Sequence, residues 1–61
     1  MEWEEFLKKT KKTIAKYPQY KSDIIDLVYL AKDEIEDGES PTHEIEKALY
    51  SITELCETGS Y

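Results

Sequence analysis

The sequence contains no arginine, a single cysteine, and only two glycines and two prolines. One cysteine, Cys56, cannot form an internal disulfide, which is typical of a protein from a reducing compartment. The longest strictly apolar run, Leu27 to Ala31, is far shorter than the ~20 residues that a membrane-spanning helix needs. Three acids among the first five residues differ from the basic start of a secretory signal peptide. These absences predict a cytoplasmic protein with no membrane association.

The short chain combines a high share of apolar residues with a high share of charged ones. Its 61 residues are 39% apolar and 36% charged, and the net charge is −6. This apolar share is too high for a disordered acidic tail. A chain of this length buries only about 60% of its unfolded surface, and an enclosed pocket of about 300 Å³ or more would consume much of its core. We therefore predict a non-enzymatic protein with no catalytic residue and no cofactor.

Apolar residues recur at steps of three and four in three segments, at about residues 2–17, 22–37 and 41–57. This is the helical period, and no segment shows the alternation of a strand. The pattern predicts an all-α fold, a small three-helix bundle that forms a single domain over residues 1–61. The candidate core residues are Trp3, Phe6, Leu7, Thr10, Ile14, Tyr17, Ile24, Leu27, Val28, Ala31, Ile35, Ile45, Ala48, Leu49, Ile52, Leu55 and Cys56. Ile25 and Leu30 widen the apolar stripe of the second segment on both sides.

Residues that start and stop helices lie at the boundaries of these segments. Ser22 is the expected N-cap of the second helix. Ser40 followed by Pro41 predicts an N-cap and a first helical position for the third helix. Gly38 and Gly59 suit the left-handed residue that ends a helix.

Charge is unevenly distributed along the chain. Residues 1–21 carry six lysines against three glutamates, a net of +3, and residues 22–61 carry two lysines against eleven acids, a net of −9. The order of Glu4 and Lys8, and of Glu5 and Lys9, favours ion pairs on the first helix. Two interpretations stay open: the lysines offset the acids within one domain, or an acidic face docks onto a basic partner.

The densest acidic stretch, residues 33–39, holds five acids in seven residues. Negative charge near the end of a helix opposes the helix dipole, and a feature that costs local stability is a candidate for function, although solubility explains it as well. Tyr29 and Tyr50 fall outside the apolar stripes, and Tyr20 lies in the first connection; if Tyr29 and Tyr50 are adjacent, they mark an interface. The candidate partner-binding residues are Asp33, Glu36, Asp37, Glu39, Glu46 and Tyr50.

Part of this stretch has the spacing of a calcium-binding loop. The matching residues, at loop positions 1, 5, 6 and 12, are Asp33, Asp37, Gly38 and Glu44. Ile35 at position 3 offers no oxygen ligand, and its place in the apolar stripe favours a helix there. His43 is the single histidine, and without paired cysteines it does not make a zinc site. We therefore predict no metal site.

Neither the cysteine nor the lysines indicate a reaction or a nucleic-acid partner. Cys56 is flanked by Glu54 and Glu57, which favours a buried thiol over a reactive one. The lysines of the first helix attract phosphate, but without arginine they lack bidentate base recognition.

Taken together, the residues predict a small acidic protein that acts by binding a larger protein with a basic surface, as an inhibitor, adaptor or regulatory accessory. Two alternatives stay open: a homodimeric structural module that uses the broad apolar stripe of residues 22–37, and a nucleic-acid mimic that occupies the basic cleft of a DNA-binding protein. In size, acidity and lack of cysteine pairs, the chain resembles the small accessory proteins of tailed bacteriophages, which implies binding to a host protein. No motif carries this resemblance, so it implies no site residue.

Overall fold

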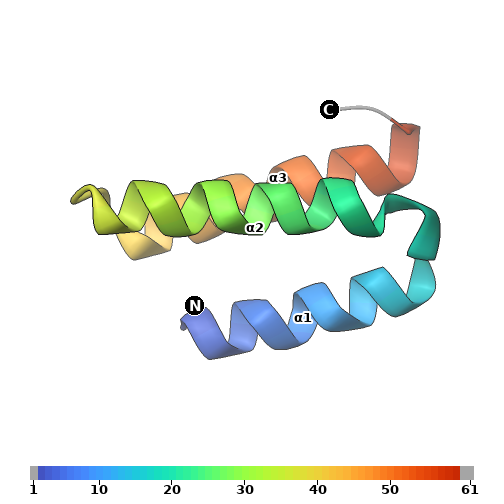
Figure 1. Cartoon of the computed structure of the whole chain (residues 1–61), viewed down its shortest axis with the longest axis horizontal. Helices are drawn as coiled ribbons and strands as arrows, with labels where there is room; N and C mark the ends of the chain where they lie inside the picture. Colours follow the sequence, from blue (N-terminus) through green and yellow to red (C-terminus); the bar gives the residue numbers. More distant parts are fainter. Residues whose placement is uncertain (1, 60–61) are drawn as a thin grey trace.

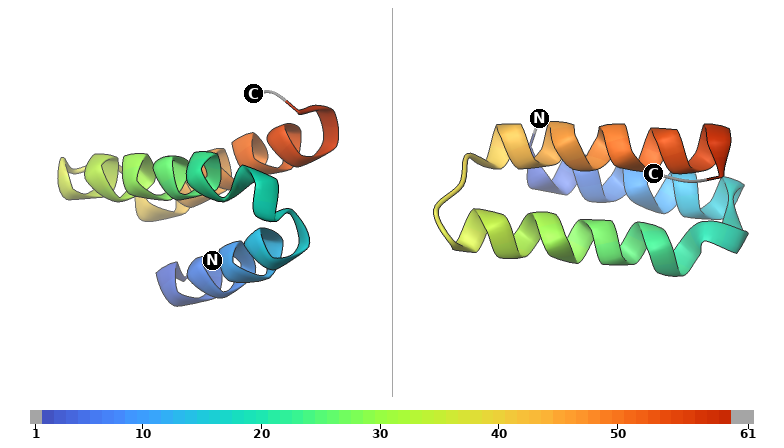
Figure 2. Two further views of the ribbon diagram at one scale, coloured as in Figure 1. Left: turned by 45° about the vertical axis from the view of Figure 1, so that its right-hand side comes forward. Right: turned by 90° about the horizontal axis from the view of Figure 1, so that it is seen from above.

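The computed structural model describes residues 2–59, and within that range the chain forms three α-helices and no strand. The elements are α1 (Trp3–Lys16), a short 3-10 helix η1 (Pro18–Tyr20), α2 (Lys21–Glu36) and α3 (Pro41–Thr58). The all-α prediction is confirmed, and the expected helix boundaries differ from these by one residue at most. α2 and α3 lie side by side and antiparallel, and α1 lies against one side of the pair (Figures 1 and 2). None of the helices within residues 2–59 has the length and apolar character that crossing a bilayer requires.

The core lies where the three helices meet. Its buried apolar side chains are Phe6 from α1, Ile24 and Ala31 from α2, and Ile45, Ala48, Ile52 and Leu55 from α3. Thr10 of α1 is buried too, and its hydroxyl donates to the Phe6 carbonyl oxygen at 2.8 Å, so the polar group is satisfied without leaving the helix. α2 and α3 pack closely, whereas α1 contacts both of them less extensively.

The first connection differs from the sequence-based prediction. Residues 18–20 form η1, and α2 then begins at Lys21 with Tyr20 at the N-cap position and no side-chain cap. The assignment of Ser22 as the N-cap was therefore wrong, because the 3-10 turn leads directly into the helix. Tyr20 is half-buried against the core, and its ring centroid lies 6.3 Å from that of Tyr17. Tyr20 thus belongs to the packing of the connection and not to an exposed surface.

Backbone hydrogen bonds fix the conformation of the connection between α2 and α3. Gly38 has a φ of +104°, a conformation that strongly favours glycine. Its N–H donates to the Ile35 carbonyl at 3.1 Å, and the Glu39 N–H donates to the Glu34 carbonyl at 3.0 Å. These two bonds form a Schellman motif, which satisfies carbonyls at the end of α2. The prediction that Gly38 ends the second helix is confirmed.

α3 has a defined start and a defined end. The Ser40 hydroxyl accepts a hydrogen bond from the His43 N–H at 3.5 Å, and Pro41 occupies the first helical turn. At the other end, Gly59 has a φ of +81° and donates its N–H to the Leu55 carbonyl at 2.8 Å. Both caps are those that the sequence predicts.

Candidate partner-binding surface

The acidic stretch lies at one end of the molecule. The end of α2, the connection at 37–40 and the start of α3 project beyond the N-terminal end of α1 (Figures 1 and 2). Asp33 and Glu36 lie in the last turn of α2, Asp37 is its C-cap, and Glu39 follows in the connection; all four side chains are exposed. We call these four residues the acidic tip.

The two remaining predicted residues lie further along α3. Glu46 and Tyr50 are exposed and one helical turn apart, and Tyr50 is 68% exposed. A hydrogen bond to the Glu54 carboxylate and the negative charge of that carboxylate raise the pKa of Tyr50 above its ordinary value. The phenol is therefore protonated at neutral pH and can donate a hydrogen bond. Within residues 2–59 no hydrogen bond or ion pair joins Glu46 or Tyr50 to the acidic tip.

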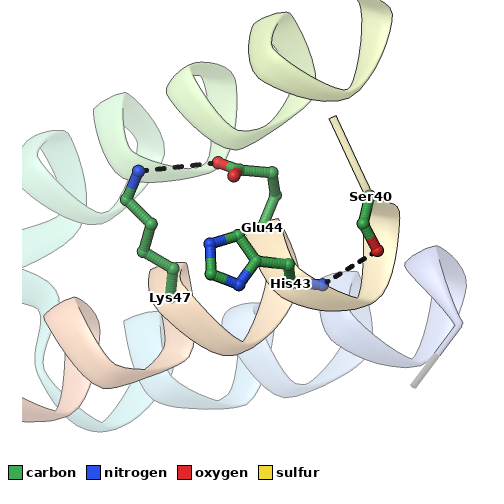
Figure 3. A network of polar contacts seen from close by, with 4 residues as sticks. All are labelled: Ser40, His43, Glu44 and Lys47. Atoms are coloured by element: carbon green, nitrogen blue, oxygen red, sulfur yellow. Dashed lines mark hydrogen bonds and ion pairs between the residues drawn. The ribbon is translucent and has the colours of Figure 1, made fainter. Parts of the chain in front are cut away.

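Few charged side chains are neutralised by a neighbour. In the part of the chain that the structure describes, the one ion pair joins Lys47 Nζ to Glu44 Oε1 at 3.8 Å (Figure 3). The ion pairs predicted within α1, Glu4–Lys8 and Glu5–Lys9, do not form, so that prediction was wrong. Exposed pairs of this kind stabilise a helix by only about 0.3 kcal/mol, which the freedom of two long side chains readily offsets. No lysine of α1 forms an ion pair with the acidic tip either.

Glu44 of α3 is a buried acid. Its exposed fraction is only 4%, although charged residues of an amphipathic helix ordinarily lie on its polar face. Its side chain is directed toward α2 (Figure 3), beside a small cavity of about 30 Å³ that Leu27 and Leu30 help to line. Burial of an unpaired carboxylate is costly, so the ion pair with the exposed Lys47 supports this position. The sequence held one signal, because Glu44 precedes the core residue Ala48 by one helical turn.

The candidate metal ligands and the single cysteine lie in positions that the fold explains. The segment 33–36 is helical, as the apolar stripe predicts, and among residues 2–59 no three His, Cys, Asp or Glu side chains converge in a way that could hold a metal ion. His43 is exposed in the first turn of α3. Burial, and then the charge of Glu57, raise the pKa of the half-buried Cys56 against an opposing effect of Lys16. The thiol is therefore protonated at neutral pH, and thiols in this form are poor nucleophiles.

A groove that was not predicted from the sequence lies between α1 and α2. Its volume is about 360 Å³, and it is lined by Trp3, Leu7, Thr10, Lys11, Ile14, Ile25, Val28, Tyr29 and Lys32. Through Trp3 and Lys32 it meets a second hollow of about 300 Å³, which Ile35, Glu36 and Pro41 also line. Tyr29, 60% exposed, borders this groove, and its ring makes no contact with that of Tyr50, so the two tyrosines do not form one aromatic patch.

No protein family, no curated protein and no solved structure matches this chain. The surface is therefore interpreted from its own chemistry. It offers two distinct features, the acidic tip on the α2–α3 hairpin and the apolar groove beside α1.

Proposed function

We propose that this protein is a non-enzymatic cytoplasmic protein that acts by binding a larger protein through the acidic tip and the neighbouring face of α3. The main support is that the four carboxylates of the tip are exposed and have no lysine within ion-pair distance among residues 2–59. Their charge is not neutralised inside the domain, so it is available to a basic partner. Such a role fits an inhibitor, an adaptor or a regulatory accessory.

The placement of the tip suits this role. In this proposal the three helices form a small bundle, and the Schellman turn at Gly38 holds the end of α2 and the start of α3 in a fixed relation. The tip carboxylates oppose the dipole of α2, and lysines or arginines of a partner would relieve that repulsion. Tyr50 adds an aromatic ring with a protonated hydroxyl, a group enriched at the centres of protein interfaces.

The proposal is tested with two variants of equal net charge. The tip variant carries Asp33→Asn, Asp37→Asn and Glu39→Gln; Glu36 is left intact because it borders the second hollow. The control variant carries Glu5→Gln, Asp26→Asn and Glu57→Gln, three exposed acids outside the tip. Each chain is used to capture proteins from a lysate of the native host, and the captured partner is then purified for affinity measurements at several salt concentrations.

We expect wild type and control to recover the same basic protein, and the tip variant to bind it about tenfold more weakly. We also expect the affinity of the wild type to fall as salt is added, because exposed charges are screened. Equal binding by the tip variant and the control would refute the tip as the contact surface. Displacement of the partner by DNA would instead favour the nucleic-acid mimic, and a stable dimer without any partner would favour the homodimeric module.

A further inference from the structure

The groove between α1 and α2 is lined mostly by apolar side chains. Six of the nine lining residues are apolar or aromatic: Trp3, Leu7, Ile14, Ile25, Val28 and Tyr29. All of them are half-buried except Tyr29, which is exposed. Each helix thus buries one flank of its apolar stripe in the core and leaves the other flank along the groove. Amphipathic helices of partner proteins bind in apolar grooves between helices.

The charges at the groove are opposite in sign to those of the molecule as a whole. Lys11 of α1 and Lys32 of α2 line it, and no acid lines the larger hollow. Neither lysine has a carboxylate within ion-pair distance among residues 2–59. Two lysine ammonium groups without an ion-pair partner therefore border the apolar lining of the groove, although the net charge of the chain is −6.

We propose that the α1–α2 groove binds an amphipathic helix of a partner protein, with apolar side chains on its inner face and Asp or Glu on its flanks. The apolar side chains of that helix pack between α1 and α2, and its acids pair with Lys11 and Lys32. The eleven residue steps from Trp3 to Ile14 span about 17 Å, so the groove accommodates about three helical turns. This surface adjoins the acidic tip at the second hollow, which Glu36 lines, but its own lining carries the opposite charge, so the protein can join two partners of different chemistry.

Charge complementarity selects this occupant over a second copy of the chain. Two copies that meet through their grooves would each bring Lys11 and Lys32 to the interface. Like charges on both facing surfaces oppose such a dimer. An acidic amphipathic helix instead offers apolar side chains to the lining of the groove and carboxylates to the two lysines.

Trp3 makes the test direct, because it is the only tryptophan of the chain and lines both hollows. The probe is a helical peptide of about 14 residues, with leucine at i, i+3, i+4 and i+7 on one face and glutamate on both flanks. Its matched control has the same leucines and lysine in place of glutamate. Each peptide is titrated against the full chain while Trp3 emission is followed. We expect the acidic peptide to shift the emission saturably and to bind about tenfold more tightly than the lysine peptide.

Charge-reversal variants locate the site. The double variant Lys11→Glu and Lys32→Glu should lose about tenfold in affinity for the acidic peptide and gain affinity for the lysine peptide. The gain cannot come from misfolding, so the test stays decisive even if the variant is less stable. Lys8→Glu with Lys12→Glu changes the net charge equally on exposed positions of α1 that do not line the groove. This control should bind both peptides as wild type does.

Three outcomes would overturn the proposal: unchanged Trp3 emission up to about 1 mM acidic peptide, equal affinity for both peptides, or a dimer in sedimentation whose formation itself buries Trp3. The tip variant described above keeps the groove residues and should bind the acidic peptide normally. The experiments therefore distinguish a failure of the tip proposal from a failure of the groove proposal.

Discussion

The α2–α3 hairpin and α1 are built from similar amphipathic segments but are packed differently. α3 buries Ile45, Ala48, Ile52 and Leu55, whereas α1 buries only Phe6 and Thr10 and keeps most of its apolar side chains half-buried. In so short a chain there is too little apolar surface to cover every flank of three stripes. The difference shows that α1 leaves a larger part of its apolar stripe half-buried than α3 does, and part of that stripe lines the groove beside α2.

The connection within the α2–α3 hairpin is also better capped than the start of α1. The hairpin has a Schellman turn at Gly38 and an N-cap bond at Ser40, but Glu2, the N-cap residue of α1, makes no side-chain cap. Helix ends without caps fray more readily. We therefore expect α1 to be the part of the fold that opens first.

The largest expected effect comes from the side chain that anchors α1. Phe6→Ala removes a fully buried ring and should lower the free energy of unfolding by about 3 kcal/mol, with faster amide hydrogen exchange in α1 than in α2 or α3. Leu7→Ala, on the half-buried groove side, should cost about 1 kcal/mol. Urea unfolding followed by circular dichroism measures both. Equal losses for the two variants would show that the groove side of α1 is packed as tightly as the core.

A smaller effect is expected at the buried acid of the hairpin. Lys47→Ala leaves the Glu44 carboxylate without its cation and should destabilise the fold by about 1 kcal/mol. Lys8→Ala, at an exposed lysine without an ion pair, should change stability by less than about 0.5 kcal/mol. In the background of Glu44→Gln the cost of Lys47→Ala should shrink, because no buried charge remains unpaired. If Lys47→Ala is as neutral as Lys8→Ala in the native background, the ion pair does not support the burial of Glu44.

The smallest effect is a change in reactivity on the side of α3 that faces α1. Cys56 shares a hollow with Thr13, Lys16 and Tyr17 of the α1 region, and burial holds its pKa above the ordinary value of 9.0. The folded state therefore binds the thiol proton more tightly than the unfolded state, so this group favours folding below pH 9 and loses that contribution as pH rises through its folded pKa. Alkylation by iodoacetamide at pH 8 should be slower in the folded chain than in urea.

The same thiol reports on the position of α1. Phe6→Ala should bring the alkylation rate closer to that of the unfolded chain, whereas Leu7→Ala should leave it nearly unchanged, with mass spectrometry as the readout. If the folded wild type reacts as fast as the unfolded chain, α1 does not cover this side of α3.

Local signals predicted the helices and most of their ends, because a helix and its caps depend on residues within a few positions of one another. The periodicity of three and four placed all three helices, and Gly38, Ser40 and Gly59 have the predicted roles. The prediction of Ser22 as an N-cap was wrong because Pro18 starts a 3-10 turn that leads into α2 without a side-chain cap. The acids of the tip are exposed as the sequence suggests, and their binding role stays a prediction.

The amino-acid sequence by itself determined that the chain is helical, where most of the helices begin and end, and that its second and third helices carry the excess negative charge. Only the tertiary structure decided that Glu44 is buried, that Leu30 stays 54% exposed, and that α1 and α2 leave an apolar groove bordered by Lys11 and Lys32. The physical reason is how far apart in the sequence the residues lie that decide each property. Helix formation follows from neighbours in the sequence, whereas burial depends on which flanks of the stripes face one another after the helices pack.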